Sequence, residues 1–284
     1  MHGIATGRAP MIDALIIGAG PTGLTLACEL LKRGMKVRIV DKLSHPMLES
    51  RALGIQSRTL ELFEKMGLIQ TFFKKGQVLQ HAHIYYKKKE FASIHFKHIS
   101  VPFPLILIIS QAETESILSS HLSECGGTIE RGVELISLSE TKAVLQNASG
   151  NLETIEARWI FGCDGAHSAV RHFQGIPFEG APFPETFALA DVEMETELPH
   201  EEVSSFIENE QLCVFFPLPR EGWFRIIVQN KEIDAKNKPT LRPLHKSDFL
   251  EKIGDFDEIS HLSEPAYAGR PIEGERKSKD RGIA

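Results

Sequence analysis

The chain has 284 residues, which is enough to bury one large or two modest hydrophobic cores. Hydrophobic residues make up 42% and charged residues 25%, and this ordinary globular composition excludes collagen-like, mucin-like and coiled-coil proteins. The 32 basic and 38 acidic side chains give a net charge of −6, so composition offers no electrostatic reason to expect nucleic acid or an anionic membrane as a partner.

The cysteines and the apolar runs indicate in which cellular compartment the protein is expected. The four cysteines lie far apart and form no C-x-x-C pair: Cys28, Cys125, Cys163 and Cys213. This spacing favours neither a zinc site nor a disulfide framework, and it predicts a cytoplasmic protein. Residues 1–10 lack the apolar core of a signal peptide, and the longest apolar run, 101–109, is too short to span a bilayer. We therefore expect a soluble protein.

In chain order, the first structural signal is a β-α-β unit. Residues 12–17 form a short apolar run that is typical of a buried parallel strand. The glycine-rich turn Gly18–Gly23 and an amphipathic helix over residues 24–33 follow it. The next apolar run, residues 35–40, ends in Asp41, which lies 23 residues after Gly18.

The remaining elements alternate less regularly. Helices are predicted over residues 59–67 and 111–124. Strands are predicted over 78–96 (two exposed-edge strands), 132–138, 143–146, 152–155, 159–161, 187–195, 212–216 and 223–229. Residues 264–284 have many charges and no helical or strand period, so a disordered tail is expected.

The spacing of the glycines suits a nucleotide. Gly18 permits a tight turn after the strand, Gly20 lets the backbone approach a pyrophosphate, and Gly23 lets the helix pack closely on the strand. Asp41 would accept hydrogen bonds from ribose hydroxyls and repel a 2′-phosphate, so FAD or NAD is favoured over NADP. The alternative is a glycine-rich turn beside a surface acid.

Four segments together resemble one family. They are Ile16–Glu29 with Arg38–Asp41, Ser50–Gln56, Ser110–Glu115 and Gly162–Arg171. In this order they resemble the class A flavoprotein monooxygenases, the FAD-dependent aromatic hydroxylases of the phenol and p-hydroxybenzoate hydroxylase type. The resemblance covers roughly residues 11–262.

The resemblance implies FAD as the cofactor, with NADH or NADPH as co-substrate. The implied cofactor-binding residues are Gly18, Gly20, Pro21, Thr22, Gly23, Asp41, Lys42, Arg51, Gln111, Asp164 and Gly165. Arg51 would neutralise pyrophosphate or flavin-proximal charge, or else be a surface arginine. Gln111 would bind the ribityl and phosphate region, or else cap its helix. Asp164 belongs to a D-G motif associated with FAD and the reduced nicotinamide nucleotide, or else caps a helix over residues 166–173.

A third cofactor motif of the family, a strand that ends in Gly-Asp, is absent from the 284 residues. The only such pair, Gly254-Asp255, follows a helix-like stretch and is interpreted as a loop. The expectation is therefore that this chain binds FAD weakly, purifies largely colourless, and needs a longer reading frame for hydroxylase activity.

Other chemistry has less support. The histidines in and after the 78–96 strands, His81, His83, His95 and His98, are candidate metal ligands, but no carboxylate or cysteine accompanies them at ligand spacing, so no metal site is expected. No nucleophile elbow or Ser/His/Asp set is present, and no catalytic residue is named.

The fold class expected is α/β: a Rossmann-like FAD-binding domain (11–77 and 106–174), an inserted, mostly antiparallel β-sheet substrate domain (78–105 and 175–262) and a disordered tail (263–284). The resemblance implies an enzyme that uses NAD(P)H and O₂ to hydroxylate an aromatic, phenolic substrate through a flavin C4a-hydroperoxide. Neither nucleic acid nor membrane is an expected partner, and homo-oligomerisation is left open.

Three points stay open at this stage. One alternative is an inactive truncated product or a non-catalytic FAD-binding remnant. Another is a different flavoprotein oxidoreductase, such as an epoxidase, halogenase or reductase. The substrate is not specified either, although pocket side chains are expected from the strands within 78–96 and 212–229.

Overall fold

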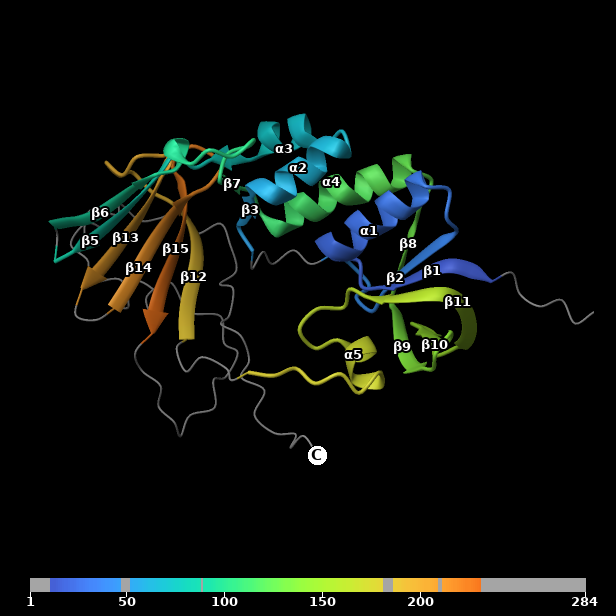
Figure 1. Cartoon of the computed structure of the whole chain (residues 1–284). Helices are drawn as coiled ribbons and strands as arrows, with labels where there is room; N and C mark the ends of the chain where they lie inside the picture. Colours follow the sequence, from blue (N-terminus) through green and yellow to red (C-terminus); the bar gives the residue numbers. More distant parts are fainter. Residues whose placement is uncertain (1–10, 47–51, 88, 181–185, 209–210, 231–284) are drawn as a thin grey trace, which may run out of the picture. The chain divides into compact units, whose positions relative to one another are not determined.

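The computed structural model describes residues 11–46, 52–87, 89–180, 186–208 and 211–230 (Figure 1). The chain forms two compact units. The first contains residues 1–49 and 111–179, and the second contains residues 50–110 and 180–284. The expected tail, the helix-like stretch before Gly254 and the Gly254-Asp255 pair lie outside the described residues.

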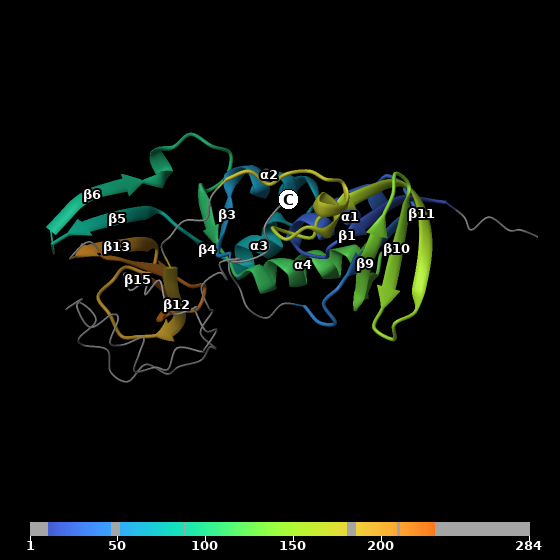
Figure 2. The ribbon, with the colours of Figure 1, turned by 90° about the horizontal axis from the view of Figure 1, so that it is seen from below.

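The first unit contains a six-stranded sheet in the order β8-β2-β1-β11-β10-β9. Its elements are β1 (Ile12–Ile17), α1 (Pro21–Lys32), β2 (Val37–Asp41), α4 (Gln111–Glu124), β8 (Ile129–Arg131), β9 (Val133–Leu138), β10 (Lys142–Asn147), β11 (Leu152–Gly162) and α5 (Ala169–Phe173). Strands β8, β2, β1 and β11 run parallel, whereas β9 and β10 extend β11 as an antiparallel meander, visible in Figure 2. The expected α/β class is confirmed.

Strand β11 corrects one prediction. The sequence suggested separate strands at 152–155 and 159–161, but a single strand of 11 residues runs through both. No glycine or proline interrupts the segment between them, so nothing forces a turn. The strand pairs with β10 over its first half and with β1 over its second half.

The core of the first unit lies around β1. Its apolar residues are almost fully buried, with Ala14, Leu15 and Ile16 at 0% exposure. Helix α1 buries Gly23, Leu24, Ala27 and Cys28, and it packs against α4. The Cys28 thiol donates to the carbonyl of Leu118 in α4, 3.8 Å away, and burial raises the pKa of this thiol to about 12.

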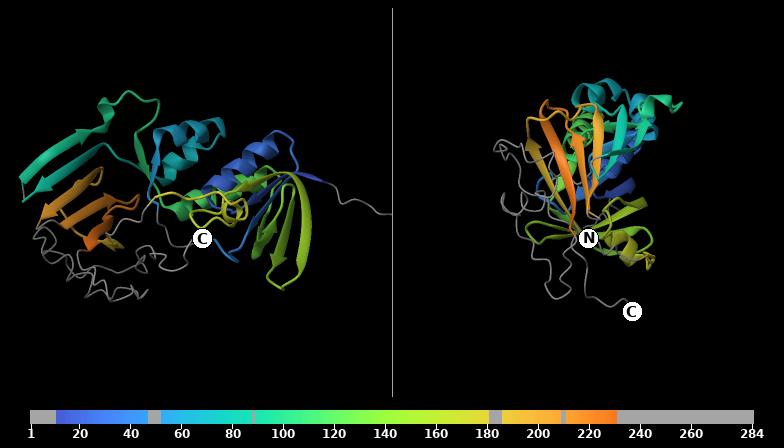
Figure 3. Two further views of the ribbon diagram at one scale, coloured as in Figure 1. Left: turned by 60° about the horizontal axis from the view of Figure 1, so that its bottom comes forward. Right: turned by 90° about the vertical axis from the view of Figure 1, so that its left-hand side faces the viewer.

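The second unit contains two sheets, of which Figure 3 shows the larger. The six-stranded sheet has the order β12-β15-β14-β13-β5-β6, and the three-stranded sheet has the order β3-β7-β4. The elements are β3 (Gly54–Gln56), α2 (Ser57–Lys65), α3 (Ile69–Lys75), β4 (Gln77–Val78), β5 (His81–Tyr86), β6 (Lys89–His95), η1 (Phe96–His98), β7 (Ile106–Ile108), β12 (Thr186–Glu193), β13 (Glu202–Glu208), β14 (Gln211–Pro217) and β15 (Trp223–Asn230).

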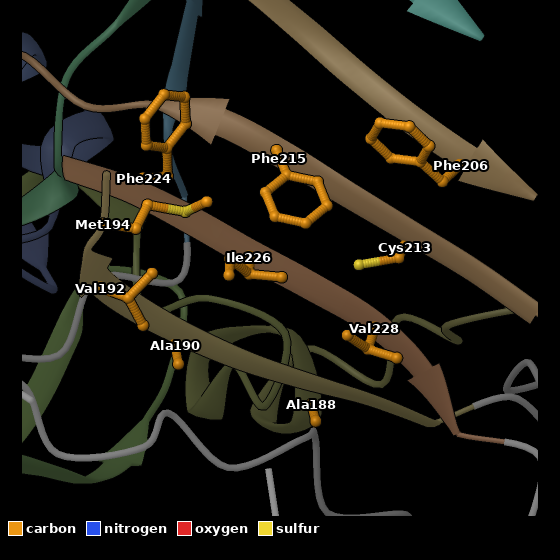
Figure 4. Close-up of a cluster of buried hydrophobic side chains, with 10 residues drawn as sticks. All are labelled: Ala188, Ala190, Val192, Met194, Phe206, Cys213, Phe215, Phe224, Ile226 and Val228. Atoms are coloured by element: carbon orange, nitrogen blue, oxygen red, sulfur yellow. The ribbon is translucent and has the colours of Figure 1, made fainter. Parts of the chain in front are cut away.

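One face of the larger sheet carries the main hydrophobic cluster of this unit, drawn in Figure 4. Alternate residues of neighbouring strands form it, as the two-residue period of a strand requires. Its members are Ala188, Ala190, Val192, Met194, Phe206, Cys213, Phe215, Phe224, Ile226 and Val228. The sheet is antiparallel except for the parallel pair β5 and β13.

Several elements of this unit were not predicted, namely α3, β3, β7 and β13, and β8 of the first unit was missed as well. They are short or only weakly periodic. Residues 50–77, which the sequence analysis grouped with the FAD-binding domain, fall in the second compact unit. A compact unit is defined by contacts within the chain, whereas a functional domain is defined by what it binds. The predicted domain boundaries therefore stay a prediction. In the described part of the chain, no helix combines the length and apolar character that a membrane crossing needs.

Candidate nucleotide site and a second cavity

Three strand ends of the first unit meet at one edge of the parallel sheet. The amide of Gly18, after β1, donates to Val40 O in β2 at 2.8 Å, and the amide of Cys163, after β11, donates to Ile17 O at 2.7 Å. Ligands of open α/β sheets bind beyond the carboxyl ends of the strands. The two motifs that the sequence separates by about 140 residues, around Gly18 and Asp164, are therefore adjacent in space.

Two glycines of the turn are required by the protein itself. A Cβ at Gly18 would lie 2.3 Å from the Cys163 carbonyl oxygen, and the φ angle of Gly18 is +102°, which other residues rarely adopt. A Cβ at Gly23 would lie 2.0 Å from the Gly18 carbonyl oxygen. These glycines allow strand, turn and helix to pack closely.

Gly20 differs from both. Its backbone is extended, and a Cβ built there meets no described atom within 4 Å. Gly20 is the N-cap of α1, it provides no side-chain cap, and Pro21 begins the helix. The first amides of a helix lack intrahelical partners and carry a partial positive charge. The space at Gly20 therefore borders an exposed set of donors, an arrangement that binds phosphate groups.

Asp41 connects β2 to this turn. One of its carboxylate oxygens, Oδ2, accepts from the Ala19 amide at 2.7 Å, and Oδ1 accepts from the Leu43 amide at 2.8 Å. The carboxylate is thus held in a fixed orientation beside the glycine turn, and each oxygen retains a further lone pair. Lys42 is exposed next to it. Arg131, which sequence reasoning missed, lies 3.9 Å from Asp41 Oδ2.

Asp164 caps α5. Its Oδ1 accepts from the Ser168 hydroxyl at 2.6 Å, and its Oδ2 accepts from the Ala169 amide at 2.6 Å. The N-cap position itself belongs to Ser168, so the helix begins at 169 and the expected start at 166 is wrong. Gly165, with φ +82°, makes the turn between them. Burial and the charge of Asp164 raise the pKa of the Cys163 thiol.

The last two predicted cofactor-binding residues are Gln111 and Arg51, and the structure describes only the first of them. Gln111 begins α4, as expected, and its side-chain amide donates to Glu115 Oε1 at 2.8 Å within the same helix. Glu115 is buried, so this bond satisfies a carboxylate that would otherwise be costly to bury. Arg51 lies outside the described residues.

The second unit contains a cavity of about 220 Å³. Its lining is mostly apolar and comes from three separate stretches of chain: Leu53, Gly54, Gln56, Ile106, Ile108, Phe216, Arg225 and Ile227. Three of these residues belong to the 212–229 stretch that was expected to line a pocket, and none to 78–96. The residues from β3 and β7 were missed because both strands are only three residues long.

Arg225 is the one charged residue of this lining. Its side chain is 2% exposed, and its guanidinium forms a double ion pair with Asp191, Nε to Oδ1 at 2.6 Å and Nη2 to Oδ2 at 2.8 Å. Such a two-point pair fixes the orientation of the planar guanidinium. The sequence contains two signals of this ion pair. One arginine lies between the apolar residues Phe224 and Ile226, and one aspartate lies between Ala190 and Val192.

The histidine pair of β5 has a partner that the sequence did not reveal. Both oxygens of Glu202 in β13 face it, with Oε1 3.0 Å from His81 Nδ1 and Oε2 3.0 Å from His83 Nε2. Glu202 stands at no ligand spacing from these histidines in the sequence, and only the pairing of β13 with β5 brings it to them. Among the residues that the structure describes, no group of side chains is arranged to hold a metal ion. The contacts cross-link the parallel strands.

Comparison with known proteins gives the family. The FAD-binding domain family matches residues 11–257. Rifampicin monooxygenase from Streptomyces venezuelae is 30% identical over 237 residues, 81% of this chain and 48% of that protein. Pentachlorophenol 4-monooxygenase from Sphingobium chlorophenolicum is 29% identical over 272 residues, 93% of this chain and 50% of that protein. The chain spans about half the length of these relatives.

Solved structures agree on the fold. The ternary complex of aklavinone-11 hydroxylase with FAD and aklavinone has a TM-score of 0.74 at 21% identity, over 93% of this chain and 52% of that one. Anhydrotetracycline hydroxylase from Streptomyces rimosus has a TM-score of 0.66 at 27% identity, over 86% of this chain and 48% of that one. The chain belongs to the FAD-binding domain family, the family of the FAD-dependent aromatic monooxygenases that it resembles.

Proposed function

We propose that the first unit binds the adenosine diphosphate part of FAD. The observation that carries the proposal is the contrast within one turn: Gly18 and Gly23 are required by internal packing, whereas the space at Gly20 is open and borders the N-terminus of α1. A phosphate oxygen fits such a space, and a branched side chain would fill it. Pro21 and Thr22 are the first two residues of α1, next to this space.

The other predicted residues take roles around this turn. Asp41, held by Ala19 and Leu43, presents its carboxylate to the ribose hydroxyls, with Lys42 beside it. Gln111 and Arg51 remain proposed contacts to the rest of the cofactor.

Asp164 is better described as a positioning residue. Both of its oxygens already accept hydrogen bonds from the start of α5. Its carboxylate therefore fixes the turn that carries Gly165, and Gly165 provides the close backbone approach. This assignment follows the capping alternative that the sequence left open.

We infer that the activity is FAD-dependent hydroxylation of an aromatic ring with NADH or NADPH and O₂. When bound, FAD supplies the redox and oxygen chemistry, and the protein binds, orients and excludes water. The cavity of the second unit supports an aromatic substrate, because its walls are mainly Leu, Ile and Phe. A dry cavity of roughly 150 Å³ is already large enough for benzene, and this one measures about 220 Å³. With its four free thiols, we place the protein in the cytoplasm.

The experiment uses the purified chain with saturating FAD, each nicotinamide nucleotide in turn and a set of simple phenols. With FAD in excess over a weakened site, the expected result differs from the inactivity that the missing Gly-Asp motif predicts: NADH or NADPH is consumed when a phenol is present, and the product carries one atom from isotopically labelled O₂. Consumption that no phenol accelerates, with FAD demonstrably bound, would favour a different flavoprotein reaction.

A further inference from the structure

The charged residue that lines the cavity of the second unit is already paired. Arg225 is 2% exposed, and the register of the sheet places it between Asp191 on β12 and Phe216 on β14. Asp191 accepts from the guanidinium through both of its carboxylate oxygens, at 2.6 Å and 2.8 Å. Because the two opposite charges lie so close together, the guanidinium adds little net positive charge to the cavity wall.

The rest of the lining offers neutral groups. Apart from Arg225, it consists of apolar side chains together with Gly54 and Gln56. Gln56 is exposed and occupies the N-cap position of α2, but its side chain does not cap that helix. A side-chain amide both donates and accepts hydrogen bonds, so Gln56 suits a neutral hydroxyl group.

These surroundings discriminate between ligands by charge. A carboxylate that leaves water for a mainly apolar wall loses its hydration, and this loss is repaid only by a cation that is not already neutralised. The cation of this lining is shared with Asp191. An uncharged ring with one hydroxyl group loses far less hydration and gains from the burial of its apolar surface. The cavity therefore favours a neutral aromatic ligand over an anionic one of the same shape.

We propose that the ion pair of Asp191 with Arg225 makes the cavity selective for uncharged phenols and against phenols that carry a carboxylate. Asp191 is the specificity-determining residue, because it neutralises the cation that would otherwise attract an anionic substituent. The proposal rests on the proposed function, since it takes the cavity as the site of the aromatic substrate. It adds which class of phenol is accepted and which side chain makes the distinction.

Two probes of nearly the same shape test the selectivity. At pH 7, 4-hydroxybenzamide is uncharged and 4-hydroxybenzoate carries a carboxylate. Each is titrated into the purified chain with saturating FAD, and binding is read from the NMR shifts of the Gly54 and Ile227 amides, which line the cavity. This measurement needs no turnover. We expect 4-hydroxybenzamide to bind at least tenfold more tightly than 4-hydroxybenzoate.

The outcomes of this titration separate the two proposals. Equal or tighter binding of 4-hydroxybenzoate would overturn the selectivity and leave the cavity as an aromatic site. Binding of neither probe would overturn both the selectivity and the assignment of the cavity to an aromatic substrate.

Asp191→Asn tests the role of the ion pair, because it removes the negative charge with little change in shape. The affinity for 4-hydroxybenzoate relative to 4-hydroxybenzamide should rise at least tenfold. Glu193→Gln is the matched control: it makes the same charge change on β12, beside Arg220 and outside the cavity lining. An equal rise in both variants would refute the proposal, since the overall charge of the sheet would then decide the selectivity.

A second pair of variants keeps the test valid if Asp191→Asn fails to fold. Gln56→Arg adds an unpaired cation to the lining at an exposed position, which the fold should tolerate. The same affinity ratio should rise at least tenfold, whereas Gln56→Met, which adds no charge, should leave it unchanged. Circular dichroism verifies that each variant is folded. An unchanged ratio in folded Gln56→Arg would contradict the proposal, because a net positive charge in the lining would then not attract the carboxylate.

Discussion

The candidate sites of the two units are built in opposite ways. In the first unit, the candidate site consists mainly of backbone groups. These are the glycines that permit close packing and the helix amides, together with one carboxylate that two backbone amides fix. In the second unit, side chains from three distant stretches line an open cavity, and an ion pair with Asp191 fixes its charged residue, Arg225. A site made from backbone geometry leaves a local motif in the sequence, whereas a site assembled from distant side chains does not.

The largest expected effect comes from breaking the packing of the glycine turn. Gly18→Ala places a Cβ 2.3 Å from the Cys163 carbonyl oxygen at a φ of +102°, so strain and overlap add. We expect a loss of about 3 kcal/mol or more in the free energy of unfolding. Gly20→Ala, its control in the same turn, should stay within about 1 kcal/mol of the parent chain. Urea unfolding measures both, and similar losses would contradict the distinction.

The next effect concerns the second unit. Arg225→Leu leaves Asp191 without this partner, and because the Asp191 side chain is 29% exposed, we expect a loss below the about 3–5 kcal/mol that breaking a fully buried pair costs. The double variant Arg225→Leu with Asp191→Leu should recover part of this loss. Urea unfolding of the three variants forms a double-mutant cycle. Losses that simply add would show that the two side chains are independent.

A smaller effect is expected at α5. Ser168→Ala removes the N-cap that accepts from the Arg171 amide and the hydroxyl that donates to Asp164. The expected loss is about 1 kcal/mol. Ser149→Ala, in the exposed turn between β10 and β11, is the control and should change stability very little. Thermal unfolding compares the two, and an equal shift would show that the cap contributes nothing.

The same contrast explains what sequence reasoning achieved. The β-α-β unit, the glycine turn, Asp41 and the start of α4 were predicted because each depends on neighbouring residues. The role of Asp164 was left between cofactor contact and helix cap, and only the hydrogen bonds to Ser168 and Ala169 favour the cap.

What was missed depends on residues far apart in the chain. The pairing of Asp191 with Arg225 follows from the register of β12 and β15, which no local pattern specifies. Glu202 reaches His81 and His83 only because β13 lies parallel to β5. Strand β11 was divided in two because its pairing partner changes along its length, a fact that periodicity does not encode.

The central claim is that the turn after β1 recognises the adenosine diphosphate part of FAD. Isothermal titration of ADP into the parent chain and into Gly20→Val tests it most directly, with Ala148→Val in the exposed turn after β10 as the matched control. We predict that Gly20→Val keeps the circular dichroism spectrum and the unfolding midpoint of the parent but loses at least a hundredfold in ADP affinity, while Ala148→Val binds normally. An unchanged affinity in a folded Gly20→Val variant would contradict the account.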